Sequence, residues 1–143
     1  MRLRRPGFTL LEAVLVLALI SILILAGAAS ASKSASRFDL ERAVWEIKMR
    51  LNQTRIRSIW EGTPARLRID RVGFSLETYD EDAKIWKPAE SGRWEGVVVE
   101  ANNTPVYHPT GSVTGMATIL VSNPRGAYRI TLAITGRIRA IKL

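Results

Sequence analysis

The chain is organised around Gly7-Phe8-Thr9-Leu10-Leu11-Glu12, which an apolar run over residues 13–29 follows. From residue 8 to residue 29 the only ionisable side chain is that of Glu12, and the next charge along the chain is Lys33. An apolar stretch of about 20 residues is long enough to cross a bilayer as a helix. A carboxylate near the start of such a stretch is costly in lipid and is a functional-site hypothesis by default. We therefore expect residues 8–29 to form a membrane-spanning helix in which Glu12 has a specific task.

The residues that precede the apolar run set its orientation. Arg2, Arg4 and Arg5 stand in front of it, together with Pro6. Positively charged flanks stay on the cytoplasmic side of a membrane. The chain is therefore expected to cross once, with everything after Ala29 on the far side.

The stretch from Arg5 to Glu12, with the apolar helix behind it, resembles the class III signal of type IV pilins and type II secretion pseudopilins. The resemblance implies that a prepilin peptidase cuts between Gly7 and Phe8, so that residues 1–7 are a leader peptide. It implies that the new amine of Phe8 is N-methylated, and that Glu12 faces the N-terminal amine of a neighbouring subunit during assembly. The implied location is the inner membrane, single-pass, with the C-terminal domain periplasmic, and then an assembled pilus or pseudopilus.

The same region is open to two other interpretations. A cleavable secretory signal also combines a basic start, a short apolar core and small residues at the cut. Ala26-Gly27-Ala28 and Ala29-Ser30-Ala31 would serve as such cutting sites. A plain single-span anchor is the other alternative. Neither explains Glu12, because a charge has no use in a discarded segment or a simple anchor, so the pilin-type signal is favoured.

Length and composition leave room for one folded module behind this segment. The chain has 143 residues, which is the size of one ordinary domain. It has no cysteine, so disulfides and thiolate metal sites are excluded. His108 is the only histidine, and it has neither a second histidine nor a convincing acid cluster to form a metal site or a catalytic triad. We expect no cofactor, no metal and no enzymatic activity.

Charge is unevenly distributed along the chain, whose net charge is +8. Acidic residues outnumber basic ones between Leu76 and Glu100, and no acid follows Glu100. The basic residues that follow are Arg125, Arg129, Arg137, Arg139 and Lys142. Such asymmetry indicates either a polyanionic or acidic partner, or a solvated basic surface balanced by acidic residues of the same or a neighbouring subunit.

The second part of the expected helix, residues 30–62, is amphipathic from Phe38 onward. Leu40, Val44, Ile47 and Leu51 recur at the spacing of one helical face. We expect this stripe to be widened by Trp45, Met49, Ile56 and Ile59. No proline occurs between Pro6 and Pro64, so one helix is expected from about residue 9 to residue 60, ended by Gly62 and Pro64. Many major pilins carry a helix-breaking proline in the first half, so its absence favours a minor pilin or pseudopilin.

After Pro64 the apolar period changes to two, which predicts antiparallel β-sheet over residues 63–143 and an α+β fold. Strands are expected at residues 67–69, 72–79, 85–86, 97–99, 106–107, 117–122 and 127–134, with a final strand after Gly136. Residues 87–96 are expected to be a loop under which Trp86 and Trp94 pack.

Three finer expectations concern strand placement. The strand at residues 106–107, flanked by Pro105 and Pro109, is expected at a sheet edge. The turn Asn123-Pro124-Arg125-Gly126 should pair Ser122 with Ala127 and put Ile119, Val121, Tyr128 and Ile130 on one face, which Leu132 and Ile134 continue. Pairing of Ile134 with Ile138 would then place Arg139 on the outer face.

The C-terminal third is similar to the domain of the GspH/FimT family of pseudopilins, which packs antiparallel sheets on the exposed half of the long helix. The similarity is carried by Tyr107-His108-Pro109-Thr110-Gly111, residues 119–121, Tyr128-Arg129-Ile130 and Thr135-Gly136-Arg137-Ile138-Arg139. FimT-type minor pilins have a Gly-Arg-x-Arg motif in the last hairpin that contacts DNA during uptake, and residues 136–139 match it. The resemblance therefore implies a structural subunit that associates with other pilins or pseudopilins, or alternatively a minor pilin that binds DNA through Arg137 and Arg139.

Overall fold

The computed structural model describes residues 9–143, without the side chains of residues 26–37. One helix, α1 (Leu10–Glu61), precedes all the strands of this part of the chain. The strands are β1 (Ala65–Ile69), β2 (Gly73–Asp80), β3 (Ile85–Arg93), β4 (Val98–Ala101), β5 (Val106–Tyr107), β6 (Val113–Thr114), β7 (Ala117–Asn123), β8 (Gly126–Leu132) and β9 (Ile138–Lys142). The predicted single helix is confirmed, and Gly62 ends it in the left-handed conformation, with φ of 67°.

The chain divides into two compact units, Met1–Ala35 and Ser36–Leu143. In the first unit, the large apolar side chains from Leu10 to Leu25 are all exposed. Among the residues that the structure describes, no helix reaches the length and apolarity of a membrane span.

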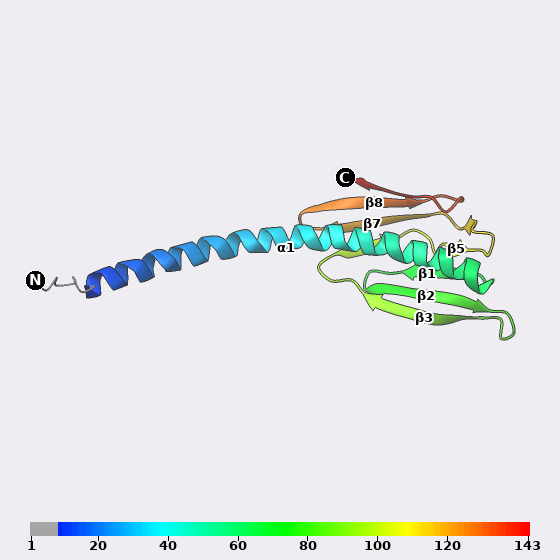
Figure 1. Cartoon of the computed structure of the whole chain (residues 1–143). Coiled ribbons are helices and arrows are strands. Elements are labelled where there is room, and N and C mark those ends of the chain that lie inside the picture. Colours follow the sequence, from blue (N-terminus) through cyan, green and yellow to red (C-terminus); the bar gives the residue numbers. More distant parts are fainter. Residues whose placement is uncertain (1–8) are drawn as a thin grey trace, which may run out of the picture. The chain divides into compact units, whose positions relative to one another are not determined.

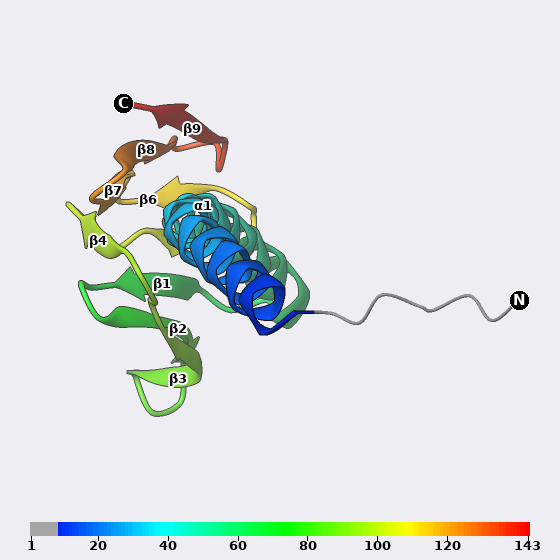
Figure 2. The same cartoon turned by 90° about the vertical axis from the view of Figure 1, so that its left-hand side faces the viewer.

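In the second unit, the strands form two antiparallel sheets beside the C-terminal half of α1 (Figure 1). Within the described residues, one sheet has the order β3-β2-β1-β5-β6 and the other the order β4-β7-β8-β9. Viewed along the helix, the two sheets form a curved layer around one side of α1 (Figure 2). The predicted α+β class is confirmed.

The core lies between this half of α1 and the inner faces of both sheets. The helix contributes the predicted stripe, in which Ile47 and Leu51 have no exposed surface. The sheets contribute buried side chains from both sides: Leu67, Phe74, Leu76, Tyr107 and Val113 from the first, and Val99, Ile119, Val121, Ile130 and Leu132 from the second. One helical face thus joins the two sheets through apolar burial, the main stabilising contribution in folding.

The prediction that Trp45, Met49, Ile56 and Ile59 widen the buried stripe is wrong. Trp45 is 66% exposed and Ile56 56% exposed, because the sheets cover only one side of the helix. The helix therefore carries a second apolar face that nothing in the described part of the chain covers.

Residues 87–96, expected to be a loop, mostly belong to β3, which pairs with β2 along its whole length. Pro88 is tolerated because β3 is an edge strand, and a shift in the register between Leu76 and Glu77 accommodates the irregularity.

The packing role expected for the two tryptophans is found in part. Trp94 is buried with its ring 5.1 Å from that of Phe74, whereas Trp86 lies half-buried on β3 against Tyr79.

The edge position predicted for β5 is also wrong, since this two-residue strand lies between β1 and β6. Pro105 and Pro109 stand outside the paired residues, so they cost no ladder hydrogen bond.

In the last sheet, Ser122 pairs with Ala127 as predicted. The predicted pair Ile134–Ile138 is replaced by Leu132–Ile138, and Ile134 is exposed in a longer loop. Because the register differs by two residues, side chains keep their faces, and Arg139 stays on the outer face opposite Thr131.

Candidate assembly and anion-binding surfaces

The predicted cleavage and methylation residues, Gly7 and Phe8, lie outside the described residues. Glu12 lies in the first turn of α1, where its amide donates to the Thr9 hydroxyl oxygen at 3.3 Å and to the Thr9 carbonyl at 3.1 Å. Thr9 therefore caps the helix, and Glu12 is the third residue of α1, where the helix dipole favours a negative charge.

The exposed large apolar residues of α1 from Trp45 onward lie on one face of the helix, which we call the outer stripe. Its side chains follow the spacing of one helical face, roughly opposite the buried stripe. It consists of Trp45, Met49, Ile56, Ile59 and Trp60, all at least 41% exposed. An exposed apolar face of this kind is a candidate interaction site.

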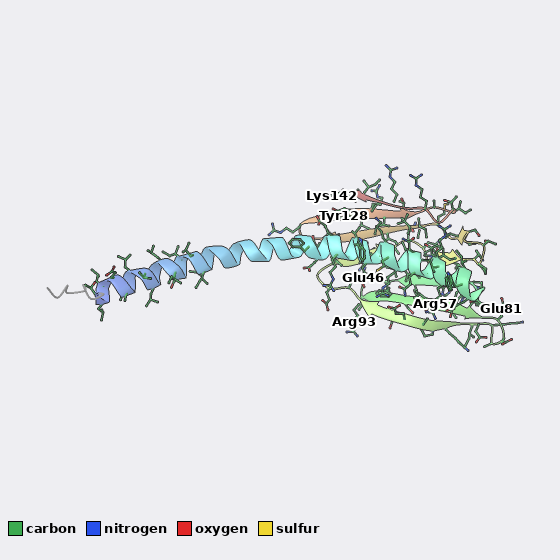
Figure 3. All side chains as sticks on the ribbon, viewed as in Figure 1. Glu46, Arg57, Glu81, Arg93, Tyr128 and Lys142 are labelled. Carbon is green, nitrogen blue, oxygen red and sulfur yellow. The ribbon has the colours of Figure 1, made fainter. Side chains whose placement is uncertain are left out.

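The outer face of the four-stranded sheet is basic. Side chains with nitrogen tips project from β8 and β9 on the side away from α1 (Figure 3). Arg129 and Arg139 lie on this face, and Arg137 is exposed in the loop between the two strands. Among the described residues these three arginines have no ion pair. Glu100, an acid on the same face, pairs with Arg71 at 2.5 Å.

Arg137 and Arg139 line one shallow hollow of about 540 Å³ on this face. Thr118 and Thr131, which pair across β7 and β8, also line it, as does Met116. Guanidinium groups and hydroxyls are hydrogen-bond donors for oxyanions. Arg125 lies at the other end of β8, in the β7–β8 turn, and does not share the hollow. The two arginines that the sequence singled out thus meet at one surface.

A helix residue supports the loop that carries Arg137. Gly136 has φ of 79°, and a Cβ added there would lie 3.0 Å from Cζ of Arg55. Gly111 has the same φ, and its added Cβ would lie 3.3 Å from Nη2 of Arg55. The Arg55 guanidinium is therefore packed between two glycine turns, which the hydrogen bond from the Val113 amide to the Ile134 carbonyl connects at 2.9 Å. Only residues without a Cβ leave this space at a positive φ.

Tyr107 lies beside this cluster, with no exposed surface and with a hydroxyl that has no hydrogen-bond partner among the described residues. Burial raises the pKa of Tyr107 above its ordinary value, and the positive charge of Arg55 opposes this rise only in part. The phenol is therefore neutral at physiological pH.

Sequence reasoning missed the contributions of Arg55 and the two threonines. Thr118 and Thr131 could have been found, because strand alternation puts them on the face opposite Ile119 and Ile130. Arg55 could not, since nothing local indicates which loop a helix residue meets. The described residues contain no group of three or more histidine, cysteine, aspartate or glutamate side chains that could hold a metal ion.

Comparisons with known proteins find a sequence motif at the start of the chain and structures with a similar fold. Residues 2–28 match the family model of the prokaryotic N-terminal methylation motif. No curated protein matches the sequence significantly. Among solved structures, the minor pseudopilin EpsH of the Type 2 Secretion System of Vibrio cholerae has a TM-score of 0.62 and 16% identity, covering 73% of this chain and 97% of that chain. The type IV minor pilin FimU of Pseudomonas aeruginosa has a TM-score of 0.57 and 15% identity, covering 71% and 92%.

The chain thus has the N-terminal methylation motif at its start and shares its fold with these two solved structures.

Proposed function

We propose that this protein is a minor pilin or pseudopilin, a structural subunit that assembles into a type IV pilus or a type II secretion pseudopilus. Residues 8–29 anchor it in the inner membrane, with the folded unit on the periplasmic side. The prepilin peptidase removes residues 1–7, and Phe8 becomes the methylated N-terminus. The observation that carries this proposal is the N-terminal methylation motif, matched over residues 2–28.

Exposed apolar surface supports an assembled state. The side chains from Leu10 to Leu25 and the outer stripe are both uncovered in the single chain. Large exposed apolar surfaces are unfavourable in water, so each needs lipid or another subunit as a partner. Glu12 is the only charged side chain between residues 8 and 29. Its carboxylate is costly in lipid, and pairing with a cation lowers that cost. The methylated amine of Phe8 on a neighbouring subunit supplies that cation.

The N-terminus of the mature protein tests this proposal. Mass spectrometry of membrane-extracted protein is expected to find a chain that begins at Phe8 and carries a methyl group on its amine. Deletion of the prepilin peptidase should leave residues 1–7 attached. A mature chain that begins near Ser30 or Ser32 would instead show a secretory signal and remove the basis of the proposal.

The hollow lined by Arg137 and Arg139 favours a second candidate, a DNA-binding minor pilin. Both arginines lack an acidic partner among the described residues, and two threonine hydroxyls lie with them. None of the described residues that line the hollow is aromatic, so bases have nothing to stack on there, and contact with duplex phosphates is the better match. Such contacts carry affinity without reading sequence and weaken steeply with salt. The expected affinity is about 10⁻⁴–10⁻⁶ M at physiological salt.

Titration of the full chain in detergent micelles with duplex DNA tests this second candidate. Arg137→Gln/Arg139→Gln should lose binding and show a smaller salt dependence. Arg125→Gln is the matched control, because it removes an equal kind of charge outside the hollow. Absence of binding by the parent at low salt leaves the purely structural subunit as the function.

A further inference from the structure

A second hollow lies on the outer face of the other sheet, where β1, β2 and β3 meet. It has a volume of about 750 Å³ and is lined by side chains of all three strands. The ladder places Arg68 opposite Ser75, and Ser75 opposite Ser91. Gly73 pairs with Arg93 one step further along the same face. The surface is hollow there because two serines and a glycine form its floor, with long side chains around them.

The two acidic side chains that line this hollow already accept hydrogen bonds from other groups of the chain. Glu77 is buried and accepts hydrogen bonds from Arg66, at 2.6 Å to Nε and 2.5 Å to Nη2. Asp70 accepts from the amides of Val72 and Gly73 at 2.9 and 2.8 Å, which holds the β1–β2 turn. Arg66 therefore neutralises Glu77, whereas Asp70 keeps its charge but is held at the turn by backbone amides.

The side chains of Arg68 and Arg93 are exposed, and their guanidinium groups have no ion pair or hydrogen bond within the described part of the chain. Arg93 lies on β3, the edge strand of the sheet (Figure 3). Strand spacing and rise separate the two Cα atoms by about 12 Å, two strands across and two residues along. An arginine side chain is long enough for both guanidinium groups to approach one anion across this separation. The free groups of the hollow are then two guanidiniums and two hydroxyls, and all of them donate hydrogen bonds.

We propose that this hollow binds a phosphate or sulfate group, held between Arg68 and Arg93 over the hydroxyls of Ser75 and Ser91. Guanidinium groups match the oxygens of such anions in pairs, and the two arginines outnumber Asp70, the one carboxylate of the hollow without a cationic partner among the described residues. The site is separate from the hollow of Arg137 and Arg139, which lies on the other sheet, and it does not depend on the proposed functions above.

Nuclear magnetic resonance of the ¹⁵N-labelled full chain in detergent micelles tests this proposal. Inorganic phosphate and sulfate are titrated at constant ionic strength, with chloride as the reference. Saturable shifts of the amides of Gly73, Ser75 and Ser91 are expected. Arg68→Gln and Arg93→Gln should each weaken binding by about tenfold, the effect of losing one hydrogen bond to a charged group. Arg125→Gln, an exposed arginine of the other sheet, is the matched control and should bind as the parent does.

Two results would overturn the proposal: equal shifts with chloride, or binding that both arginine variants retain. A parallel titration with a duplex oligonucleotide identifies the source of the phosphate. If Arg68→Gln and Arg93→Gln weaken both titrations, the site takes a nucleic-acid backbone. If they weaken only the inorganic titration, it takes a small oxyanion or a phosphate carried by another molecule.

Discussion

At the residue scale, the proposed function depends most on Glu12. It is the only charge between residues 8 and 29, and it stands in the first turn of α1. Removing it should make membrane insertion easier, by roughly 2–3 kcal/mol on translocon-type scales. We predict that Glu12→Ala is inserted and cleaved but enters filaments poorly, because the amine of its neighbour no longer has a carboxylate to face.

Fractionation measures this, as the ratio of processed protein in sheared filaments to processed protein in the membrane. Glu12→Gln keeps the size of the side chain and removes only its charge, so it should fail in the same way. Normal incorporation of Glu12→Gln would show that the charge has no part in assembly.

Tyr107 gives a second prediction at this scale. Its hydroxyl is buried without a partner, so Tyr107→Phe should be neutral or stabilising for folding. Burial raises the folded pKa of Tyr107 above the value near 10 of an unfolded tyrosine. Above about pH 10 the unfolded chain therefore releases this proton while the folded chain keeps it, and stability falls as the pH rises.

Urea unfolding of the parent and of Tyr107→Phe at pH 8 and pH 11 checks the sign. The parent should lose more stability over this interval than the variant does. An equal loss in both proteins would mean that the phenol titrates normally in the folded state.

At the scale of elements, helix α1 shows what apolar periodicity can and cannot predict. The pattern identified Leu40, Val44, Ile47 and Leu51, and all four are buried. It also assigned Trp45 and Ile56 to the core, although both are exposed. Periodicity reports that a face is apolar. It does not report whether the partner of that face is the same chain or another molecule.

Two predictions about the strands, those for β3 and for the end of β8, were wrong for a different reason. Residues 87–93 of β3 contain Pro88, charged side chains and glycine, so they have little strand character by themselves. They become a strand because β2 offers them an unpaired edge. The loop that ends β8 was misplaced because the chain turns at Ala133, where the Gly136 amide donates to its carbonyl at 2.8 Å. The prediction that Arg139 lies on the outer face was nevertheless correct, since a register change of two residues leaves each side chain on the same face of the sheet.

A matched pair of substitutions separates the two faces of α1. Leu51→Ala removes a fully buried side chain and should cost about 2–5 kcal/mol of folding stability. Ile56→Ala lies on the outer stripe and should change stability by less than about 0.5 kcal/mol. Ile56→Ala should nevertheless reduce incorporation into filaments. Thermal unfolding of the full chain in detergent gives the first comparison, and filament fractionation the second. Unchanged incorporation of Ile56→Ala and Trp45→Ala would exclude the outer stripe as a subunit contact.

For the whole molecule, the sequence predicted the α+β class and the order of its parts but not the arrangement of the strands in two sheets. Strand propensity is local, whereas the choice of neighbours depends on which edges meet over the helix. The pairing of β1 with β5, for example, joins segments about 40 residues apart, and no turn motif connects them. The shared core explains why both sheets pack on the same helix. Ile47 and Leu51, on one helical face, are buried among side chains of both sheets.

This shared core leads to a prediction about the folded unit alone. Every residue of the buried cluster lies at or beyond Leu40. A fragment over residues 36–143 should therefore unfold in one cooperative transition, with a Tm within a few degrees of that of the full chain in detergent. A difference of 1 kcal/mol would shift the Tm of such a domain by about 4–8 °C. Circular dichroism and tryptophan fluorescence should give coincident transitions, since Trp94 packs on the same core.

A fragment that begins at Thr54 is the control for this experiment. It keeps all the strands but lacks Leu40, Ile47 and Leu51, so neither sheet can bury its inner face. We expect it to show no cooperative transition. If the longer fragment also lacked one, residues 1–35 would be part of the folding unit, and the division of the chain at Ser36 would not describe its stability.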